Sequence, residues 1–535
     1  MRLSEQGLQE ERSKWEMAGY HLPKYDHKAM VERTKENPFW LHFGAGNIFR
    51  AFQANVVETL LNENKLDRGL IAVGNHDSME QLSRPHDEYS ILVTLKEDGT
   101  IEKTVVGSVA EFLTLDQGYE KEFKRLKEIM TKDSLQMVSF TITEKGYSLK
   151  TGDGSYIEEV KEDLKNGPEH PDSYMGKITA LLYARYLAGQ KPLAMVSMDN
   201  CSHNGDQLKE AVAVFAEKWC ALGLAKAGFD AYVNDSAKVS FPWSMIDKTT
   251  PRPDSTVEEI LAKDGIQNLK PIITSRQTYI APFVNAEECQ YLVIEDSFPN
   301  GRPALEQGGL IFTDRETVEK TEKMKVCTCL NPLHTALAVF GCLLDFKFIW
   351  EEMKDETLRG LVEKIGYGEG LPVVVDPGVL NPKEFIDTVL HMRIPNPFMP
   401  DTPQRIATDT SQKLAIRFGE TIKAYQASKD LDVKSLKLIP LVFAGWLRYL
   451  MAVDDKGKTF ELSADPLLDI VCPYVSALEL KEGQDVESAV APVLRMKQIF
   501  GVDLYEAGLA EQVIQCLKEM TSGVGAVRAT LNKYV

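Results

Sequence analysis

The sequence has no apolar run long enough to cross a bilayer. Its two longest apolar segments, residues 336–344 and 438–447, end at Asp345 and Arg448. A membrane-spanning helix needs about 20 predominantly apolar residues, so both segments are predicted to be buried helices. The first 20 residues also lack the apolar core of an export signal, and we expect a cytoplasmic protein with no membrane partner.

Positive charge is scarce as well. The chain has 61 Lys and Arg residues against 79 Asp and Glu residues, a formal net charge of −18, and no run of five like charges. So acidic a chain repels the phosphates of nucleic acids. We therefore expect a small-molecule partner and no nucleic acid. The oligomeric state stays open between a monomer and a small homo-oligomer.

The eight cysteines include no C-x-x-C pair. Cys327, Cys329 and His334 are close enough in sequence to suggest metal ligands, but no second pair completes a tetrahedral site. Free thiols in a reducing compartment are the simplest interpretation, and no metal is expected.

The first half alternates short β-rich runs with helical patterns, which favours a doubly wound parallel sheet. The predicted strands are residues 39–43, 70–73, 137–142 and 193–197. Residues 90–95 and 101–109, joined by Asp98-Gly99, are predicted to form a hairpin added to this sheet.

After about residue 315, long helical patterns dominate. They cover residues 335–348, 384–392, 412–427, 436–453 and 486–500. A chain of 535 residues is too long for one core. We expect an α/β domain over residues 1–312 and a mainly helical domain over 313–535, with the boundary somewhere between Ile246 and Glu322.

A glycine turn at Gly44-Ala45-Gly46 follows the first predicted strand and opens a helix. The first glycine permits a tight turn, and the second lets a pyrophosphate approach the helix N-terminus. Phe49 stands where a third glycine is usual. The turn predicts dinucleotide binding, with Asn47 and Ile48 among the cofactor-binding candidates, and a plain strand–helix turn is the alternative.

Two charged residues bear on this cofactor site. Arg50 in the first helical turn opposes the helix dipole and needs an anionic partner, either a pyrophosphate or a buried carboxylate. Asp77 follows the second strand and suits the ribose hydroxyls of NAD. It stands 28 residues past Phe49 instead of about 20, so a helix N-cap is the alternative. NAD is favoured and NADP stays open.

A second group of polar residues lies between Lys325 and His334. Lys325, Asn331 and His334 place an amine, a carboxamide and an imidazole within ten residues. These groups can take a proton, stabilise an oxyanion and orient a hydroxyl, as oxidation of a secondary alcohol requires. Asn331-Pro332 is typical of a helix start, with Asn331 as N-cap. A helix that begins there places Asn331 and His334 one turn apart on one face.

Five short strings stand out along the chain, at residues 43–50, 141–147, 197–205, 241–248 and 331–334. They occur in the order seen in the polyol-specific long-chain dehydrogenases, the mannitol dehydrogenase family. The chain resembles that family over roughly residues 38–430. The resemblance implies a Rossmann-type N-terminal domain, a helical C-terminal domain and a metal-independent, nicotinamide-dependent oxidoreductase.

The resemblance also implies roles for single residues. Lys325 resembles the general base, and Asn200 and Asn331 resemble the amides that hold the alkoxide oxygen. His334 resembles the residue that orients the substrate. Three further residues resemble substrate-contacting or acidic positions near the site: Arg405, Lys413 and Asp247.

The spacing departs from the family in one place. Five residues separate Lys325 from Asn331, where the family usually has four. One extra residue rotates a helix by about 100°, so Lys323 is a rival base. In one unbroken helix Lys325 and His334 would face opposite sides. A helix reset at Asn331 would absorb the extra residue.

Structural alternatives stand beside these roles. Lys325 ends a charged stretch and could be a surface lysine. His334 could be a core histidine, and Asn200 could be a turn residue. His203 is interpreted as a loop residue. A solvated i, i+4 ion-pair ladder is the alternative for four residues: Arg405, Asp409, Lys413 and Arg417.

The expected reaction is hydride transfer between a nicotinamide cofactor and a hexonate or ketohexuronate, with D-mannonate and D-fructuronate as the leading pair. An acidic substrate is expected because Arg405 and Lys413 can pair with its carboxylate. Lys248, nearby in the motif order, can do the same. Mannitol and tagaturonate are alternatives that use the same chemistry. A nucleotide-dependent epimerase and a non-catalytic sugar-nucleotide-binding protein are alternatives of other classes.

Overall fold

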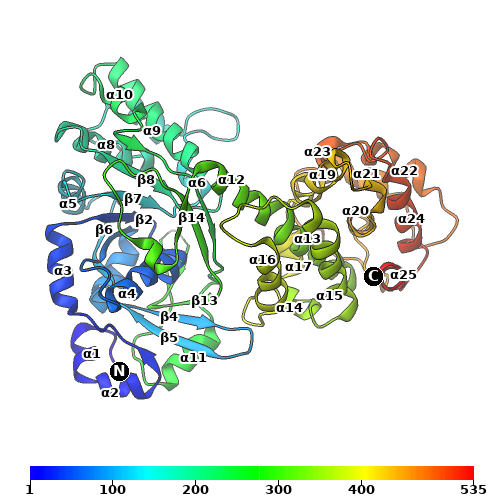
Figure 1. Cartoon of the computed structure of the whole chain (residues 1–535), viewed down its shortest axis with the longest axis horizontal. Helices are drawn as coiled ribbons and strands as arrows, with labels where there is room; N and C mark the ends of the chain where they lie inside the picture. Colours follow the sequence, from blue (N-terminus) through cyan, green and yellow to red (C-terminus); the bar gives the residue numbers. More distant parts are fainter. Residues whose placement is uncertain (276) are drawn as a thin grey trace. The chain divides into compact units, whose positions relative to one another are not determined.

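A six-stranded parallel sheet forms the centre of the first of two compact units (Figure 1). The computed structural model describes residues 1–275 and 277–535. The first unit comprises residues 1–95 and 100–319, and the second comprises residues 96–99 and 320–535. In spatial order the strands are β6 (Val109–Thr114), β3 (Leu70–Gly74), β2 (Trp40–Phe43), β7 (Met137–Phe140), β8 (Leu193–Ser197) and β9 (Val239–Ser240).

This strand order is that of a Rossmann fold, in which the chain winds outward from β2 in one direction and from β7 in the other. All neighbouring strands are parallel. The predicted doubly wound sheet is therefore confirmed. The switch in winding direction falls between β2 and β7, where such folds bind their ligands beyond the carboxyl ends of the strands.

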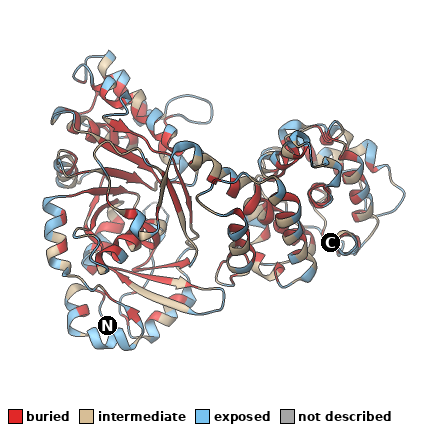
Figure 2. Cartoon of the chain, in the orientation of Figure 1, coloured by how far each residue is buried: buried red, intermediate tan, exposed pale blue. Residues whose placement is uncertain are grey.

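Both faces of the sheet are covered, and strands β2 and β8 are buried along their whole length (Figure 2). In β2, Leu41 and Phe43 pack into one core and Trp40 into the other. The helices of this unit are α1 (Glu5–Glu10), α2 (Arg12–Met17), α3 (His27–Glu36), α4 (Ala54–Asn62), α5 (Glu120–Met130), α6 (Glu144–Tyr147), α7 (Glu158–Asn166), α8 (Tyr174–Leu187), α9 (Asn204–Ala221), α10 (Phe229–Asn234) and α11 (Ser255–Lys263).

The predicted hairpin exists, but it does not extend the main sheet. β4 (Ser90–Leu95) and β5 (Ile101–Val106) pair antiparallel within a separate four-stranded sheet, together with β1 (Tyr20–His21) and β13 (Phe283–Glu287). The apolar run predicted to end at Val109 contains the end of β5 and the start of β6. A periodic pattern does not reveal that the chain changes sheets at Gly107-Ser108.

The remaining strands form two small sheets. These are β10 (Ser244–Asp247), β14 (Tyr291–Glu295) and β15 (Ile311–Thr313) in one sheet, and β11 (Ile272–Ile273) with β12 (Tyr279–Ile280) in the other.

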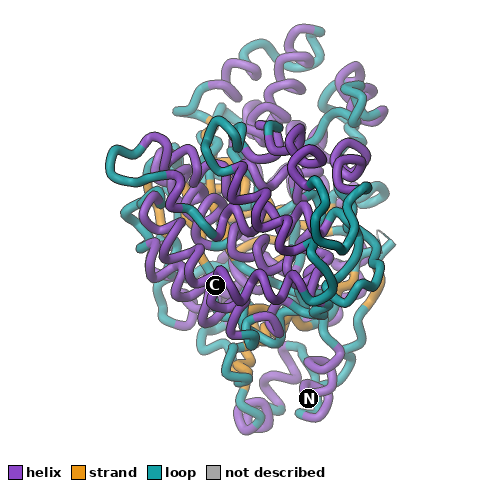
Figure 3. The backbone as a smooth tube through the Cα atoms, turned by 90° about the vertical axis from the view of Figure 1, so that its right-hand side faces the viewer, coloured by secondary structure: helices purple, strands orange, loops and turns teal. Residues whose placement is uncertain are grey.

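The second unit is built almost entirely from helices (Figure 3). Helix α12 (Arg315–Met324) leads into it. Its helices are α13 (Asn331–Leu344), α14 (Ile349–Glu352), α15 (Glu356–Glu363), α16 (Pro382–Thr388), α17 (Pro403–Ala407), α18 (Thr410–Leu414), α19 (Glu420–Ala427), α20 (Leu438–Tyr449), α21 (Leu468–Val475), α22 (Val486–Leu494), α23 (Lys497–Phe500), α24 (Ala510–Met520) and α25 (Ala526–Tyr534).

Two apolar helices, α13 and α20, lie in the core of this unit. The helical run Arg315–Leu344 is long and apolar enough to cross a membrane, but 72% of its most apolar window is buried in the protein, as in the core helix of a soluble protein. Helix α20 receives its N-terminal cap from a distant side chain. The Glu369 carboxylate accepts hydrogen bonds from the N–H groups of Lys437, Leu438 and Ile439 at 2.6–2.8 Å.

Six π-helical turns interrupt the helices of the described residues. π-Helix is rare in proteins and concentrates at functional sites. Because the predicted helices 384–392 and 412–427 each contain such a turn, a 3.6-residue pattern located these helices but not their irregularity. The turns are Phe49–Gln53, Ser78–Ser83, Lys325–Cys329, Lys364–Gly370, Val389–Arg393 and Ala415–Gly419.

Candidate active site

The glycine turn after β2 has two glycines with different constraints. Gly44 has φ +100°, and a Cβ there would lie 2.1 Å from the carbonyl oxygen of Thr141. The fold itself therefore requires glycine at this position. A Cβ on Gly46 would approach no protein atom closer than 4.0 Å. The fold therefore does not require glycine at position 46, and the open space in front of its backbone suits the approach of a ligand.

Arg50 lies in the π-helical turn that follows and is buried. Its guanidinium donates to the carbonyl oxygen of Ala281 at 2.6 Å and to the Asn47 carboxamide oxygen at 3.0 Å. Burial lowers the pKa of Arg50 to about 10, which leaves it charged at neutral pH. Among the residues described, no carboxylate pairs with it and its Nε has no acceptor, so the buried-carboxylate alternative fails. Neighbouring Ile48 packs against the core beneath the turn.

Asp77 does not cap a helix. The Asn75 side chain accepts the N–H of Ser78 at 2.8 Å instead. The Asp77 carboxylate accepts from the N–H and the hydroxyl of Ser275 at 2.9 and 2.7 Å, and from Gln81 at 2.8 Å. The Ser275 hydrogen bonds lower the pKa of Asp77. An ionised carboxylate thus follows β3 near the edge where such folds bind the ribose of their cofactor.

The loop after β7 is strained. Strand β7 ends at Phe140, two residues earlier than predicted, and Thr143 has φ +65°. This conformation is unfavourable for a β-branched residue and costs about 1–3 kcal/mol. The Asp199 carboxylate stabilises the loop by accepting the N–H groups of Ile142 and Thr143 at 3.0 and 2.8 Å and the Tyr147 hydroxyl at 2.5 Å. Burial raises the pKa of Asp199, and these three donors oppose that rise.

Asp199 was missed as a positioning residue, although it lies in one of the five strings. Its neighbour Asn200 is exposed in the loop that follows β8. The Asn204 side chain anchors this loop by donating to the carbonyl oxygens of Ser197 and Asp199 at 3.2 and 3.0 Å. His203 is a loop residue, as predicted, and stacks on Trp243 with 4.1 Å between ring centroids.

Two further predicted residues lie at the end of β10. Asp247 is buried. The Lys248 amine donates to the carbonyl oxygen of Glu287 at 2.8 Å and to Gln290 at 3.0 Å.

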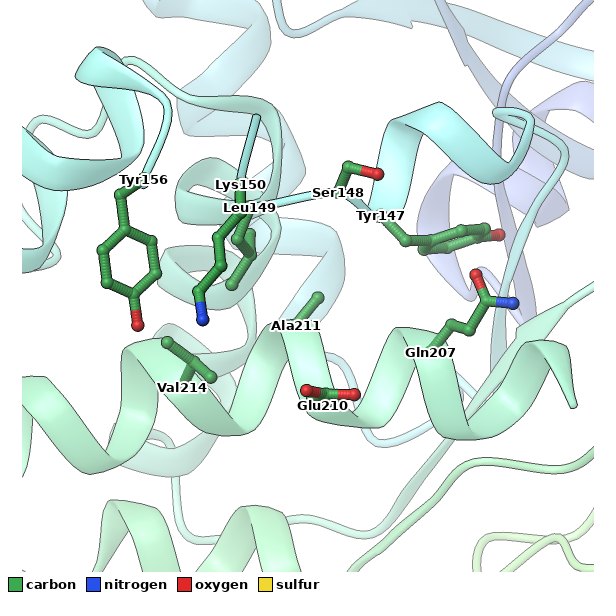
Figure 4. Close-up of a pocket in the computed structure, with 9 residues that line it drawn as sticks. All are labelled: Tyr147, Ser148, Leu149, Lys150, Tyr156, Gln207, Glu210, Ala211 and Val214. Atoms are coloured by element: carbon green, nitrogen blue, oxygen red, sulfur yellow. The ribbon is translucent and has the colours of Figure 1, made fainter. Parts of the chain in front are cut away.

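A cavity of about 270 Å³ in the first unit contains none of the predicted site residues (Figure 4). The ring of Tyr147 borders it, and Gln207 and Glu210 of α9 form one wall. The Tyr147 hydroxyl is engaged by Asp199 and by Ser197 at 2.8 Å. This cavity is therefore a neighbour of the strained loop and not the predicted site.

Lys325 is 3% exposed, so the surface-lysine alternative is wrong. Its rival Lys323 is exposed. Lys325 opens a π-helical turn in which the Leu330 N–H bonds to the Lys325 carbonyl oxygen at 3.1 Å, five residues back. Such a turn holds one more residue than an α-helical turn. The additional residue between Lys325 and Asn331 is accommodated in this way.

The helix reset predicted at Asn331 is confirmed. Leu330 leaves the helical conformation with φ −127° and ψ −61°, and α13 starts at Asn331 with Pro332 in its first turn. The N-cap residue is Leu330 and not Asn331, which corrects the prediction by one residue. The Asn331 carbonyl oxygen accepts the Thr335 hydroxyl at 2.9 Å. Its carboxamide has no hydrogen-bond partner among the residues described.

His334 lies one turn into α13 with a side chain 21% exposed. Its Nε2 is 3.7 Å from the Asp401 carboxylate. Burial lowers the pKa of His334 to about 4, Asp401 opposes this, and the cations Arg417, Arg405 and Arg393 lower it further. The imidazole is therefore neutral at neutral pH and can both donate and accept a hydrogen bond.

The residues predicted as a possible ion-pair ladder do not form one. Asp409 adopts φ +55° between α17 and α18, which interrupts the helix. Arg405 pairs with Asp401, the Lys413 amine donates to the Thr408 carbonyl oxygen, and Arg417 donates to the Thr335 hydroxyl. We call Arg393, Arg405, Lys413 and Arg417 the cation cluster.

The metal alternative receives no support from the thiols. Burial raises the pKa of Cys327 to about 11 and that of Cys329 to about 12, so both thiols stay protonated at neutral pH. Within residues 1–275 and 277–535, no group of three or more His, Cys, Asp or Glu side chains is placed to hold a metal ion.

Comparison with known proteins gives the same picture along the whole chain. The family description "Mannitol dehydrogenase Rossmann domain" matches residues 39–307, and "Mannitol dehydrogenase C-terminal domain" matches residues 317–521. The chain is 50% identical to the D-mannonate oxidoreductase of Thermotoga maritima, covering 100% of this chain and 99% of the relative. It is 29% identical to the polyol:NADP oxidoreductase of Gluconobacter oxydans, covering 88% and 90%.

Two solved structures are similar over nearly their full length. One is a D-sorbitol dehydrogenase in substrate-free form, with a TM-score of 0.78, 25% identity and coverage of 95% of this chain and 97% of that chain. The other is Pseudomonas fluorescens mannitol 2-dehydrogenase in a ternary complex with NAD and D-mannitol. Its TM-score is 0.69 and its identity 25%, with coverage of 100% and 99%.

Proposed function

The chain belongs to the mannitol dehydrogenase family, and from this premise we propose that it is an NAD-dependent oxidoreductase that interconverts D-mannonate and D-fructuronate. The observation that carries the substrate class is the cation cluster around His334. Four cations stand there in a chain of net charge −18. A neutral polyol has no group that needs them, whereas a sugar-acid carboxylate does.

The first unit supplies the groups that suit the cofactor. Gly44 and Gly46 open the turn to a pyrophosphate, which Asn47 and the helix N-terminus can bind. Arg50 supplies the positive charge. The ionised Asp77 suits ribose hydroxyls and disfavours a 2′-phosphate, which supports NAD over NADP.

Bound at this site, NAD would supply the hydride-acceptor chemistry for oxidation of the substrate's carbinol carbon. Lys325 accepts the proton of the reacting hydroxyl as general base. The carboxamides of Asn200 and Asn331 donate to the oxygen as it gains negative charge, and the Asn331 carboxamide is uncommitted among the described residues. Neutral His334 orients a neighbouring hydroxyl. Arg405, Lys413 and Asp247 contact the rest of the substrate.

Spectrophotometry with the purified protein tests this proposal. D-Fructuronate, D-tagaturonate and D-fructose are each offered with NADH and with NADPH, and the loss of reduced cofactor is followed. We expect the highest kcat/KM for D-fructuronate with NADH. Absence of cofactor oxidation with every ketohexuronate would overturn the proposal, and preference for D-fructose would assign a neutral polyol as substrate.

We place the protein in the cytoplasm. Its eight cysteines are all free thiols, as is usual in a reducing compartment, and its long apolar helix is mostly buried in the protein.

A further inference from the structure

Arg417 is a half-buried member of the cation cluster, and the proposed mechanism gives it no individual role. It lies in the π-helical turn Ala415–Gly419, and burial lowers its pKa to about 10. It therefore remains charged at neutral pH. Its single hydrogen bond among the described residues goes to the Thr335 hydroxyl, and no described carboxylate pairs with it.

Two fully buried arginines show how the fold satisfies a structural guanidinium. Arg185 donates five hydrogen bonds of 2.6–3.1 Å to backbone carbonyl oxygens. Arg448 donates three, at 2.5–3.3 Å, to carbonyl oxygens. A guanidinium has five N–H donors, so Arg417 retains most of its hydrogen-bonding capacity. These remaining donors belong to a half-buried side chain, which leaves them accessible to a ligand.

The position of Arg417 defines where that ligand lies. Its partner Thr335 follows His334 in α13, and the same Thr335 hydroxyl donates to the Asn331 carbonyl oxygen at 2.9 Å. Arg417 is thus held against the turn that carries both proposed substrate-contacting side chains of α13. It is also the cation that most lowers the pKa of His334.

The local charge selects an anion. Asp401 is the one acid that markedly affects His334 among the described residues, and it is already paired with Arg405. Arg393, 8% exposed at the end of another π-helical turn, adds a further cation. The planar fork of a guanidinium fits the two oxygens of a carboxylate better than it fits a hydroxyl.

We infer that Arg417 binds the carboxylate of the sugar-acid substrate and thereby selects sugar acids over neutral ketoses and polyols. The inference rests on the proposed function and assigns its substrate specificity to one member of the cation cluster, to which the proposed mechanism gives no individual role. Thr335 acts as a positioning residue because its hydroxyl fixes one edge of the guanidinium and leaves the opposite edge for the ligand.

The experiment compares wild type with Arg417→Met and Arg417→Lys. With NADH, kcat/KM is measured for D-fructuronate and for D-fructose. For Arg417→Met we expect a loss of about 10- to 100-fold with D-fructuronate, mainly through KM, and a change within about 3-fold with D-fructose. Arg417→Lys keeps the charge but not the fork, so its loss is intermediate. Arg495→Met is the matched control, because Arg495 is an exposed arginine of the same unit paired with Asp503 at 3.4 Å.

A second readout does not depend on turnover. In the presence of NAD, saturating D-mannonate raises the Tm of the wild type by mass action. Arg417→Met should lose this rise, whereas Arg495→Met should keep it. If D-mannonate raised the Tm of Arg417→Met as much as that of the wild type, the inference would be overturned. Equal losses of kcat/KM with D-fructuronate and D-fructose would overturn it as well. Failure of the proposed function is distinguishable, because it would show in the wild type as inactivity toward every ketohexuronate.

Discussion

The two units hold their candidate residues in different ways. In the first unit, Gly44 and Asn200 lie in loops that follow β2 and β8, and Asp77 lies in the first helical turn after β3. In the second unit, Lys325 and the cation cluster stand on helices. Lys325, Arg393 and Arg417 each occupy a π-helical turn.

This contrast separates two ways of building a site. Parallel strands end at one edge of a sheet, so topology alone gathers the loops that follow them. A helix has no such edge, and its side chains must be aimed individually. A π-helical turn holds one additional residue and so redirects the side chains that precede it. The first unit also uses this device, since π-helical turns follow its glycine turn and Asp77.

The largest expected effect comes from Lys325 in the helical unit. Lys325→Ala removes the proposed base, and kcat should fall by about 100- to 10,000-fold. NADH binding, followed by fluorescence quenching, should be unchanged. Lys323→Ala is the matched control because Lys323 is exposed two residues earlier, and it should retain full activity. Activity in Lys325→Ala close to wild type would remove Lys325 from the mechanism.

Deleting Val326 tests the π-helical turn itself. Without this residue the turn Lys325–Cys329 has α-helical length, and Lys325 is rotated by about 100° relative to α13. We expect kcat to fall by about 100-fold, because a small displacement of a reacting group is costly. The Tm, measured in parallel, distinguishes this from unfolding. A folded deletion variant with normal kcat would show that the turn does not aim the lysine.

The glycines of the first unit give a matched pair of smaller effects. Gly44→Ala places a Cβ 2.1 Å from the Thr141 carbonyl oxygen at φ +100°, so the free energy of unfolding should fall by at least about 2 kcal/mol. Gly46→Ala meets open space and should leave stability unchanged while raising the KM for NADH. Equal stability losses in the two variants would contradict the assignment of Gly46 to the cofactor.

The smallest effects concern buried acids in the two cores. Glu58 of the first unit is hydrogen-bonded by Tyr25, Gly107 and Asn62 at 2.7–3.1 Å, and burial raises its pKa to about 7. Glu352 of the second unit is fully buried, and neither of its oxygens has a partner among the described residues. Burial, followed by Asp355, raises the pKa of Glu352 well above its usual value.

An acid with a raised pKa holds its proton more tightly in the folded state. Its contribution to stability is complete below the unfolded pKa of about 4.3 and is lost as pH rises toward the folded pKa. Glu352→Met should therefore raise the free energy of unfolding by about 1–3 kcal/mol, and by more at pH 8 than at pH 5. Glu58→Met should lower it, because three donors lose their acceptor. Thermal unfolding at both pH values measures the stability of the two variants. If Glu352→Met were less stable than the wild type, the conclusion that the buried Glu352 carboxyl destabilises the fold would be wrong.

Much of the first unit was predictable because its signals are local. The strands at residues 39–43, 70–73 and 193–197 were located by apolar runs between helical patterns, and alternate residues of these runs pack on both faces of the sheet. The exchange of sheets at Gly107-Ser108 was missed, since a continuous apolar run carries no mark of which sheet its residues join.

The sequence by itself determined the family, the α/β fold followed by helices, the glycine turn and the helix reset at Asn331. Each depends on residues adjacent in the chain or on an ordered set of short strings. Only the tertiary structure decided that Asp199 stabilises the strained Thr143 loop and that Asp77 is anchored by Ser275. It also decided that Arg417 is half-buried with one hydrogen-bond partner among the described residues. These contacts join residues distant in sequence. A hydrogen bond between them exists only when the whole chain brings donor and acceptor together, so no local pattern records it.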